Sequence, residues 1–174
     1  MNTDLMKSIY DSFARKAVEI FNQEGHAESQ LFVIFDSDSE KRAFFAFPPA
    51  FTSEILNTES GKDRLKPLLH RVLSDENFHR HLSEQGFQKP QMVVQISEAW
   101  VSKNLKSRDV NGFKPSEDPN RGEAILIALH TSDRSLIGLC PIVDEPTRHA
   151  EYGELELDAR NFGRMSLTTE SVLQ

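Results

Sequence analysis

The side chains with the clearest chemical potential lie between residues 97 and 130, where two strand-like segments flank a polar loop. In the first segment, Gln91–Val101, alternation places every second residue on one face of a strand: Met92, Val94, Ile96, Glu98 and Trp100. Glu98 is the exception on this face, because an ionised carboxylate among apolar side chains needs a charged or hydrogen-bonding partner. Arg121 or the backbone amides of the loop are the natural partners, since the loop returns the chain to the neighbouring strand. We therefore expect Glu98 and Arg121 to lie together.

Two interpretations of this region stay open. In the first, Glu98, Arg121 and Glu123 form a structural ion-pair cluster that holds the loop, and Trp100 packs beside it. In the second, the same cluster lines a pocket, in which a buried carboxylate acts as a general base and Arg121 holds an anion. We favour the structural interpretation, because structural ion pairs perturb carboxylates as much as active sites do.

His130 completes a candidate functional patch of Glu98, Trp100, Arg121, Glu123 and His130. It lies near the end of the second strand-like segment and shares a face with Ala124, Leu126 and Ala128. A hydrogen-bonded histidine in the core or at its rim explains this position better than a metal ligand or an acid–base group.

The sequence lacks the motifs that would name a reaction. It contains no glycine-rich phosphate loop, no dinucleotide-binding turn and no nucleophile elbow. Cys140 is the only cysteine, which leaves no zinc-ribbon or redox pair. His79 and His81 are two residues apart and cannot share one helical face. We therefore expect no metal site and no cofactor, and the catalytic residues stay unassigned.

One resemblance rests on two short motifs in this region. The first is SEAW at the end of the strand-like segment, and the second fits PSxxPxRxE; together they comprise Ser97, Glu98, Ala99, Trp100, Pro115, Ser116, Pro119, Arg121 and Glu123. In these residues the chain resembles a group of small uncharacterised proteins from bacteria and their phages. The resemblance implies no activity, but it marks the region as important.

These residues must be positioned by elements that the apolar periodicity predicts. Apolar residues at helical spacing predict helices, and short β-branched or aromatic runs predict strands. The expected helices are Thr3–Gln23, Ser53–Leu56 as a short helix or loop, and Asp63–Gln85 with a restart at Asp75. The expected strands are Gln30–Asp36, Arg42–Phe47, Gln91–Val101, Glu123–Thr131, Ser135–Val143 and Glu154–Asp158.

This order separates helices from hairpins, which favours an α+β fold over alternating β–α units. We expect an antiparallel sheet of about five to six strands with two main helices packed on it. Glu123–Thr131 is apolar on both faces and is expected at the centre, whereas the acids of Glu154–Asp158 suit an edge. A single domain is expected over residues 1–160, followed by a flexible tail over 161–174.

Composition excludes several classes of protein. The 174 residues carry a formal net charge of −7, which argues against a dedicated nucleic-acid binder. Charged side chains are spread through the first 25 residues, and no apolar run is long enough to span a membrane. We therefore expect a cytoplasmic protein with no membrane or nucleic-acid partner.

The favoured hypothesis is a small protein-binding or regulatory domain, an accessory protein of a phage or other mobile element that acts on a host protein. A homodimer is a related expectation, because the apolar stripe of the first helix is wide. The alternative is a small hydrolytic or nucleotide-directed enzyme that uses Glu98, Arg121, Glu123 and His130 around one cleft. The missing motifs lead us away from an enzyme.

Overall fold

The computed structural model describes residues 3–37, 43–56, 59–102, 121–131 and 134–156. Its helices are α1 (Thr3–Glu24), α2 (Pro49–Leu56), α3 (Glu59–Leu73) and α4 (Glu76–Glu84). Its strands are β1 (Gln30–Ser37), β2 (Ala43–Ala46), β3 (Phe87–Ser102), β4 (Arg121–His130), β5 (Ser135–Val143), β6 (His149–Ala150) and β7 (Leu155–Glu156). None of these helices is both long enough and apolar enough to cross a lipid bilayer.

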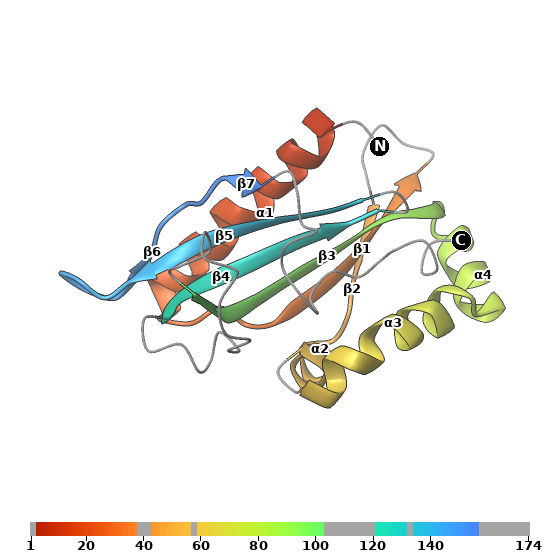
Figure 1. The fold of residues 1–174 in the computed structure, drawn as a ribbon. Coiled ribbons are helices and arrows are strands. Elements are labelled where there is room, and N and C mark those ends of the chain that lie inside the picture. The colour runs from red at the N-terminus through yellow and green to blue at the C-terminus, as the bar shows by residue number, and fades with distance from the viewer. Residues whose placement is uncertain (1–2, 38–42, 57–58, 103–120, 132–133, 157–174) are drawn as a thin grey trace.

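The strands form one antiparallel sheet in the order β2-β1-β3-β4-β5-β6, with β7 also paired to β5 (Figure 1). The expected α+β class is therefore confirmed. β4 lies inside the sheet between β3 and β5, as its two apolar faces predicted. The hairpins β1–β2 and β4–β5 are both present in the expected places.

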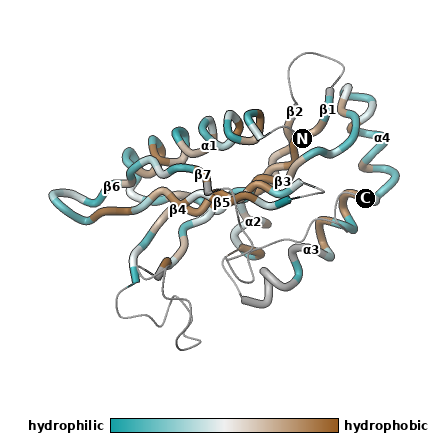
Figure 2. The backbone as a smooth tube through the Cα atoms, turned by 45° about the horizontal axis from the view of Figure 1, so that its top comes forward, coloured by the Kyte–Doolittle hydropathy of each residue, from teal (hydrophilic) through white to brown (hydrophobic). Residues whose placement is uncertain are grey.

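The helices cover the two faces of the sheet unequally. α1 lies along one face, and α2, α3 and α4 lie on the other (Figures 1 and 2). The expectation of two main helices was approximate, because the second predicted helix is divided. The division falls at Asp75, whose side chain accepts a hydrogen bond from the backbone N–H of Phe78 at 2.8 Å and caps α4.

The α1 face holds the larger core. The apolar stripe of α1 is buried against β3, β4 and β5 through Met6, Ile9, Tyr10, Ala14, Ala17 and Phe21. Tyr10 fits because Gly138 of β5 has no side chain; an added Cβ there would overlap the phenol ring. α1 ends at Glu24 and is followed by Gly25, which has φ = 77° and donates its N–H to the Phe21 carbonyl. The apolar stripe of α1 is thus buried inside the molecule, against the sheet.

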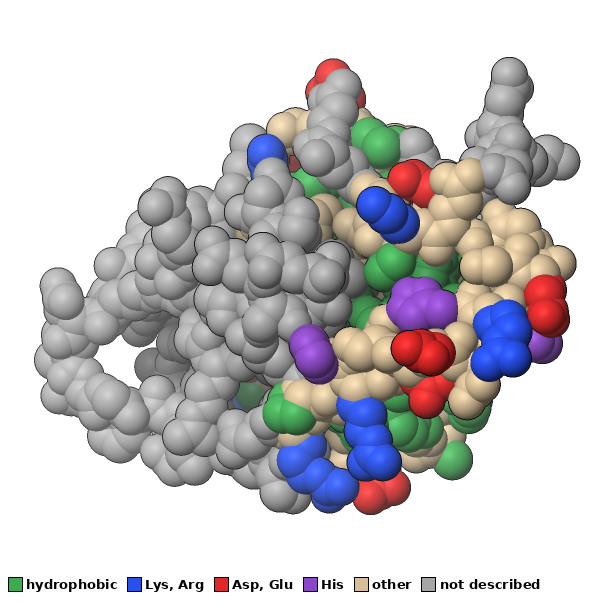
Figure 3. All heavy atoms as spheres, turned by 90° about the vertical axis from the view of Figure 1, so that its right-hand side faces the viewer, with side chains coloured by type: hydrophobic (Ala, Val, Ile, Leu, Met, Phe, Trp, Pro, Cys, Tyr) green, Lys and Arg blue, Asp and Glu red, His purple; other side chains and the backbone are tan. Residues whose placement is uncertain are grey.

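The opposite face divides into two clusters. Under β1 and β2, residues such as Leu31 and Phe35 pack against apolar side chains of α2, α3 and α4. Under β4 and β5 a separate cluster contains Leu126, Ala128 and Ile137. At the end of the molecule where α4 lies, acidic and basic side chains are interspersed with hydrophobic ones on the described surface (Figure 3).

The described part of the expected domain 1–160 ends at Glu156, which belongs to β7. The expected tail over residues 161–174 lies outside the described residues. So do residues 103–120, where a loop was expected and which include the Pro115, Ser116 and Pro119 positions of the resemblance.

Candidate functional site

Four of the five candidate residues lie at one end of the β3–β4 pair. The register pairs Trp100 with Glu123, and Arg121 lies opposite Ser102. Met92, Val94 and Ile96 are buried against α1, and the same alternation carries Glu98 and Trp100 onto that face, beyond the core. The predicted alternation of β3 is therefore confirmed.

Glu98 does not have the partner that we expected. Its side chain is exposed, and its Oε1 accepts a hydrogen bond from the backbone N–H of Ala27 at 2.7 Å. Ala27 belongs to the turn from α1 into β1. Because the last described pair between β1 and β3 joins Gln30 to Ile96, Glu98 projects past the start of β1 and meets this turn. The expectation of a buried Glu98 paired with Arg121 is wrong.

Arg121 instead lies over Trp100. Its guanidinium carbon is 4.3 Å from the centroid of the Trp100 ring, which is a cation–π geometry. The two residues are diagonal neighbours across the β3–β4 ladder, which brings a long side chain onto an aromatic one. Trp100 nevertheless keeps 44% of its surface exposed. The sheet thus holds an indole in place at the surface.

Glu123 is paired with Arg148, a residue that sequence reasoning missed. Nη2 of Arg148 donates to Oε2 of Glu123, and Nη1 donates to Oδ1 of Asp144 at 3.4 Å. The same guanidinium lies 5.7 Å from the centre of the Phe21 ring. The hydrogen bond to Glu123 raises the pKa of Arg148 above its ordinary value, and the negative charges of Glu123, Asp144 and Glu98 act in the same direction.

No periodic signal in the sequence pointed to Arg148, because it lies between β5 and β6 in a segment without alternation. Arg148 comes beside Glu123 because the chain turns after β5 and pairs with it again through β6. We call the exposed group formed by these side chains the Trp100 patch: Glu98, Trp100, Arg121, Glu123 and Arg148.

His130 does not belong to the Trp100 patch. It lies seven positions along β4 from Glu123, or roughly 23 Å at the usual strand rise, and on the opposite face. It is fully buried, and its Nδ1 is 2.9 Å from Oγ of Ser135. Burial lowers the pKa of His130 to about 4, so the ring is neutral near pH 7. This environment is that of a hydrogen-bonded core histidine.

Gln95 is another buried polar side chain near His130. Gln95 and His130 are diagonal neighbours on the same face of β3 and β4. Nε2 of each residue is buried without a hydrogen-bond partner. Such groups lower stability unless a water molecule satisfies them. Sequence reasoning missed Gln95, because the alternation places it with Gln91, Val93 and Ser97 on the more polar face of the strand.

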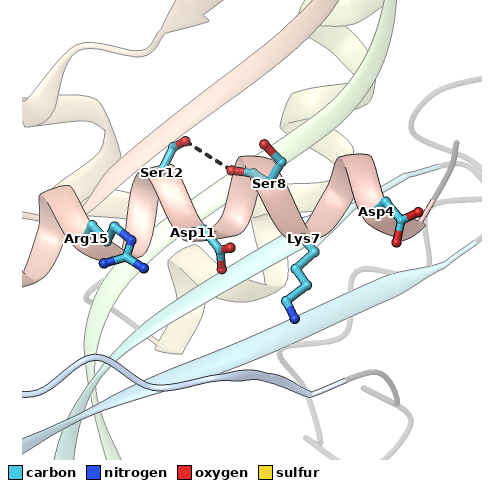
Figure 4. A pocket seen from close by; sticks show the side chains of 6 residues that line it. All are labelled: Asp4, Lys7, Ser8, Asp11, Ser12 and Arg15. Carbon is cyan, nitrogen blue, oxygen red and sulfur yellow. Dashed lines mark hydrogen bonds between the residues drawn. The ribbon is translucent and has the colours of Figure 1, made fainter.

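A depression on the outer side of α1 offers no second site. Figure 4 shows its lining side chains, which all come from this one helix: Asp4, Lys7, Ser8, Asp11, Ser12 and Arg15. The Ser12 hydroxyl donates to the Ser8 carbonyl at 3.0 Å, so it is used within the helix. Because every described lining residue belongs to α1, this depression is the polar face of an amphipathic helix.

Within the described ranges, no group of three or more His, Cys, Asp or Glu side chains is arranged to hold a metal ion. The described residues define an antiparallel α+β domain, and the Trp100 patch is an exposed aromatic and charged group at one end of its β3–β4 pair. Comparison with known proteins finds no matching family model, no similar curated protein and no matching solved structure.

Proposed function

We propose that this chain is a protein-binding domain and that the Trp100 patch is its contact with the partner. The observation that carries this proposal is the exposed Trp100 ring held under the Arg121 guanidinium. Tryptophan and arginine are the residues most enriched among those that dominate binding energy at protein interfaces. A ring that is already held in position loses less conformational freedom on binding, so more of its burial contributes to affinity.

The surroundings of Trp100 also suit an interface. Arg148 and Glu123 form an ion pair beside it, and Asp144 and Glu98 add two further acids. A mixed polar border around an aromatic centre is the usual organisation of protein interfaces. Because both signs of charge are present, the partner that fits is a protein surface with a pocket for the indole and charges of both signs around it.

The enzymatic alternative has less support. It requires Glu98, Arg121, Glu123 and His130 to reach one substrate position, as a base and an anion-binding group must. His130 lies on the other face of the sheet, and Glu98 is bonded to the backbone of Ala27. These positions favour binding over catalysis.

The resemblance of residues 97–123 to small bacterial and phage proteins supports a more specific form of the proposal. In that form the chain is a regulatory accessory protein of a phage or other mobile element, it acts in the cytoplasm, and its partner is a host protein. A direct nucleic-acid partner is not proposed, because the net charge of −7 opposes phosphate binding.

The test is quantitative affinity purification from bacterial lysate with the full chain and two variants, followed by titration of the purified candidate partner. Trp100→Ala removes the indole. Tyr152→Ala removes another exposed aromatic ring, outside both the Trp100 patch and the β2 edge, and serves as the matched control. We expect Trp100→Ala to weaken partner binding by about 30-fold, since a central residue of an interface contributes about 2 kcal/mol or more. Equal recovery of every protein by wild type and Trp100→Ala contradicts the proposal.

A further inference from the structure

The strand β2 forms one edge of the sheet, and this edge is apolar. Among the described strands, its four residues, Ala43–Ala46, pair with β1 and with no other. The strand contains no charged residue, whereas exposed edges are usually blocked by lysine, proline or a bulge. In Figure 2, where the backbone is coloured by residue hydropathy, most of β1 and β2 is brown, the colour of hydrophobic residues.

The hydrogen-bond pattern identifies the outward-facing groups. The Phe47 N–H donates to the Leu31 carbonyl at 2.9 Å, so this pair is a hydrogen-bonded pair of the β1–β2 ladder. Hydrogen-bonded and non-hydrogen-bonded pairs alternate in antiparallel ladders. Phe44, opposite Ile34, and Ala46, opposite Phe32, are therefore non-hydrogen-bonded positions. The N–H and C=O groups of Phe44 and Ala46 point away from β1.

The side chain of Phe44 marks the same edge. It is 60% exposed, the largest exposed fraction among the large hydrophobic residues described. It is nevertheless supported: its ring meets Phe32 edge-on at 6.0 Å, and Phe32 in turn packs 5.0 Å from Phe13 of α1. A row of rings thus runs from the core to the edge and holds Phe44 at the surface.

We propose that β2 pairs antiparallel with β2 of a second copy of this chain, with Phe44 of each copy opposite Ala46 of the other. In this register both outward-facing residues of each strand find a partner, which makes four N–H···O=C bonds between the copies. Phe44 then lies beside the small side chain of Ala46 from the second copy, on the α1 face. The contact is isologous and closes after two copies.

The electrostatics of the edge fit a second copy of the same chain. Two molecules with a net charge of −7 repel each other wherever their acids approach. The stretch from Ala43 to Ser53 contains no ionisable side chain, so the two copies meet at a neutral segment. Because only four residues of each strand pair, we expect a weak dimer, with a dissociation constant on the order of micromolar.

The experiment is sedimentation velocity of the full chain from low to high micromolar concentration. We expect wild type to pass from monomer to dimer. Ala46→Pro removes one outward N–H from each copy and leaves the ladder to β1 intact, since proline is tolerated on an edge when its nitrogen faces solvent. It should weaken dimerisation by at least about tenfold. Phe44→Lys places a charge at the contact and should have the same result.

Trp100→Ala is the control and should dimerise like wild type, because its ring lies outside this edge. Thermal unfolding confirms that each variant is folded. The proposal is overturned if wild type remains monomeric throughout, if both edge variants dimerise as wild type does, or if Trp100→Ala alone abolishes the dimer. The last result would assign self-association to the Trp100 patch.

Discussion

The two edges of the sheet differ in whether their outward-facing backbone groups have a hydrogen-bond partner within the described part of the chain. At the β2 edge, backbone groups of Phe44 and Ala46 point outward beside an exposed ring. At the other edge, Ala150 of β6 is covered by a side chain: its N–H donates to Oδ1 of Asn22 at 2.7 Å, and its carbonyl accepts from Nδ2 at 3.1 Å. An amide side chain of α1 thus replaces the missing strand.

The segment that follows β6 is also fastened to α1. The Tyr10 hydroxyl donates to the Gly153 carbonyl at 2.7 Å, and the Tyr152 hydroxyl donates to Oδ1 of Asp11 at 2.6 Å. Gly153 must be a glycine, because a Cβ there would overlap the Leu139 carbonyl. The difference teaches that this fold can close an edge from within. An edge without such contacts is available to another molecule.

The largest effect is expected from Gly138→Ala, because this change displaces Tyr10, which holds the segment after β6 against α1. The new methyl group would overlap the Tyr10 ring, so Tyr10 must move and release Gly153. We expect a loss of about 3 kcal/mol in the free energy of unfolding, measured by urea denaturation. Combining it with Tyr10→Leu, which removes the overlapping atoms, should cost less than the sum of the two single changes. Wild-type stability of Gly138→Ala would show that Tyr10 does not hold this edge.

Asn22→Ala should have a smaller effect on stability and a visible effect on association. It removes both hydrogen bonds to Ala150 and leaves the N–H and C=O of an edge strand facing outward. Because the site is partly solvated, we expect a loss of about 1 kcal/mol. We also expect more self-association by light scattering than for wild type. A variant that is destabilised but associates no more than wild type would separate stability from edge protection.

The smallest expected effect is a loss of stability at alkaline pH, caused by ionisation of Tyr152. The hydrogen bond to Asp11 raises the pKa of Tyr152 to about 12, from 10 in the unfolded chain. The folded state therefore binds more protons between these values, so the contribution of Tyr152 to stability is complete below pH 10 and is lost as pH rises through 12. Phenolate absorbance reports the titration, and because the chain has two tyrosines, the signal has two contributions to separate. In Tyr152→Phe, the absorbance step near pH 12 should disappear; its persistence would assign the step to Tyr10.

Much of the fold could be predicted from the local pattern of apolar residues in the sequence. The stripe of α1 and the alternation of β3 have strong periods, and both elements appear within a few residues of their predicted ends. β4 was placed centrally because both of its faces are apolar. β6 escaped prediction, since two residues are too short for any period. The pairing of β1 with β3 depends on contacts distant in sequence, which periodicity does not encode.

The candidate site was predicted less well, for a related reason. Alternation correctly brought Glu98 and Trp100 to one face, but the partners of these side chains come from elsewhere in the fold. Ala27 reaches Glu98 from the turn after α1, and Arg148 reaches Glu123 from the segment before β6. A one-dimensional pattern locates the strand that carries a charge; the neighbour of that charge is decided by tertiary structure.

The most direct test of the difference between the two edges is amide hydrogen exchange, resolved by residue, at low and high protein concentration. The Phe44 and Ala46 amides should exchange rapidly in dilute protein and become protected at high concentration. The Ala150 amide should be protected equally at both, since Asn22 already binds it. If Phe44 and Ala46 exchange equally fast at both concentrations, or if protection of Ala150 follows concentration, the assignment of an open and a closed edge is wrong.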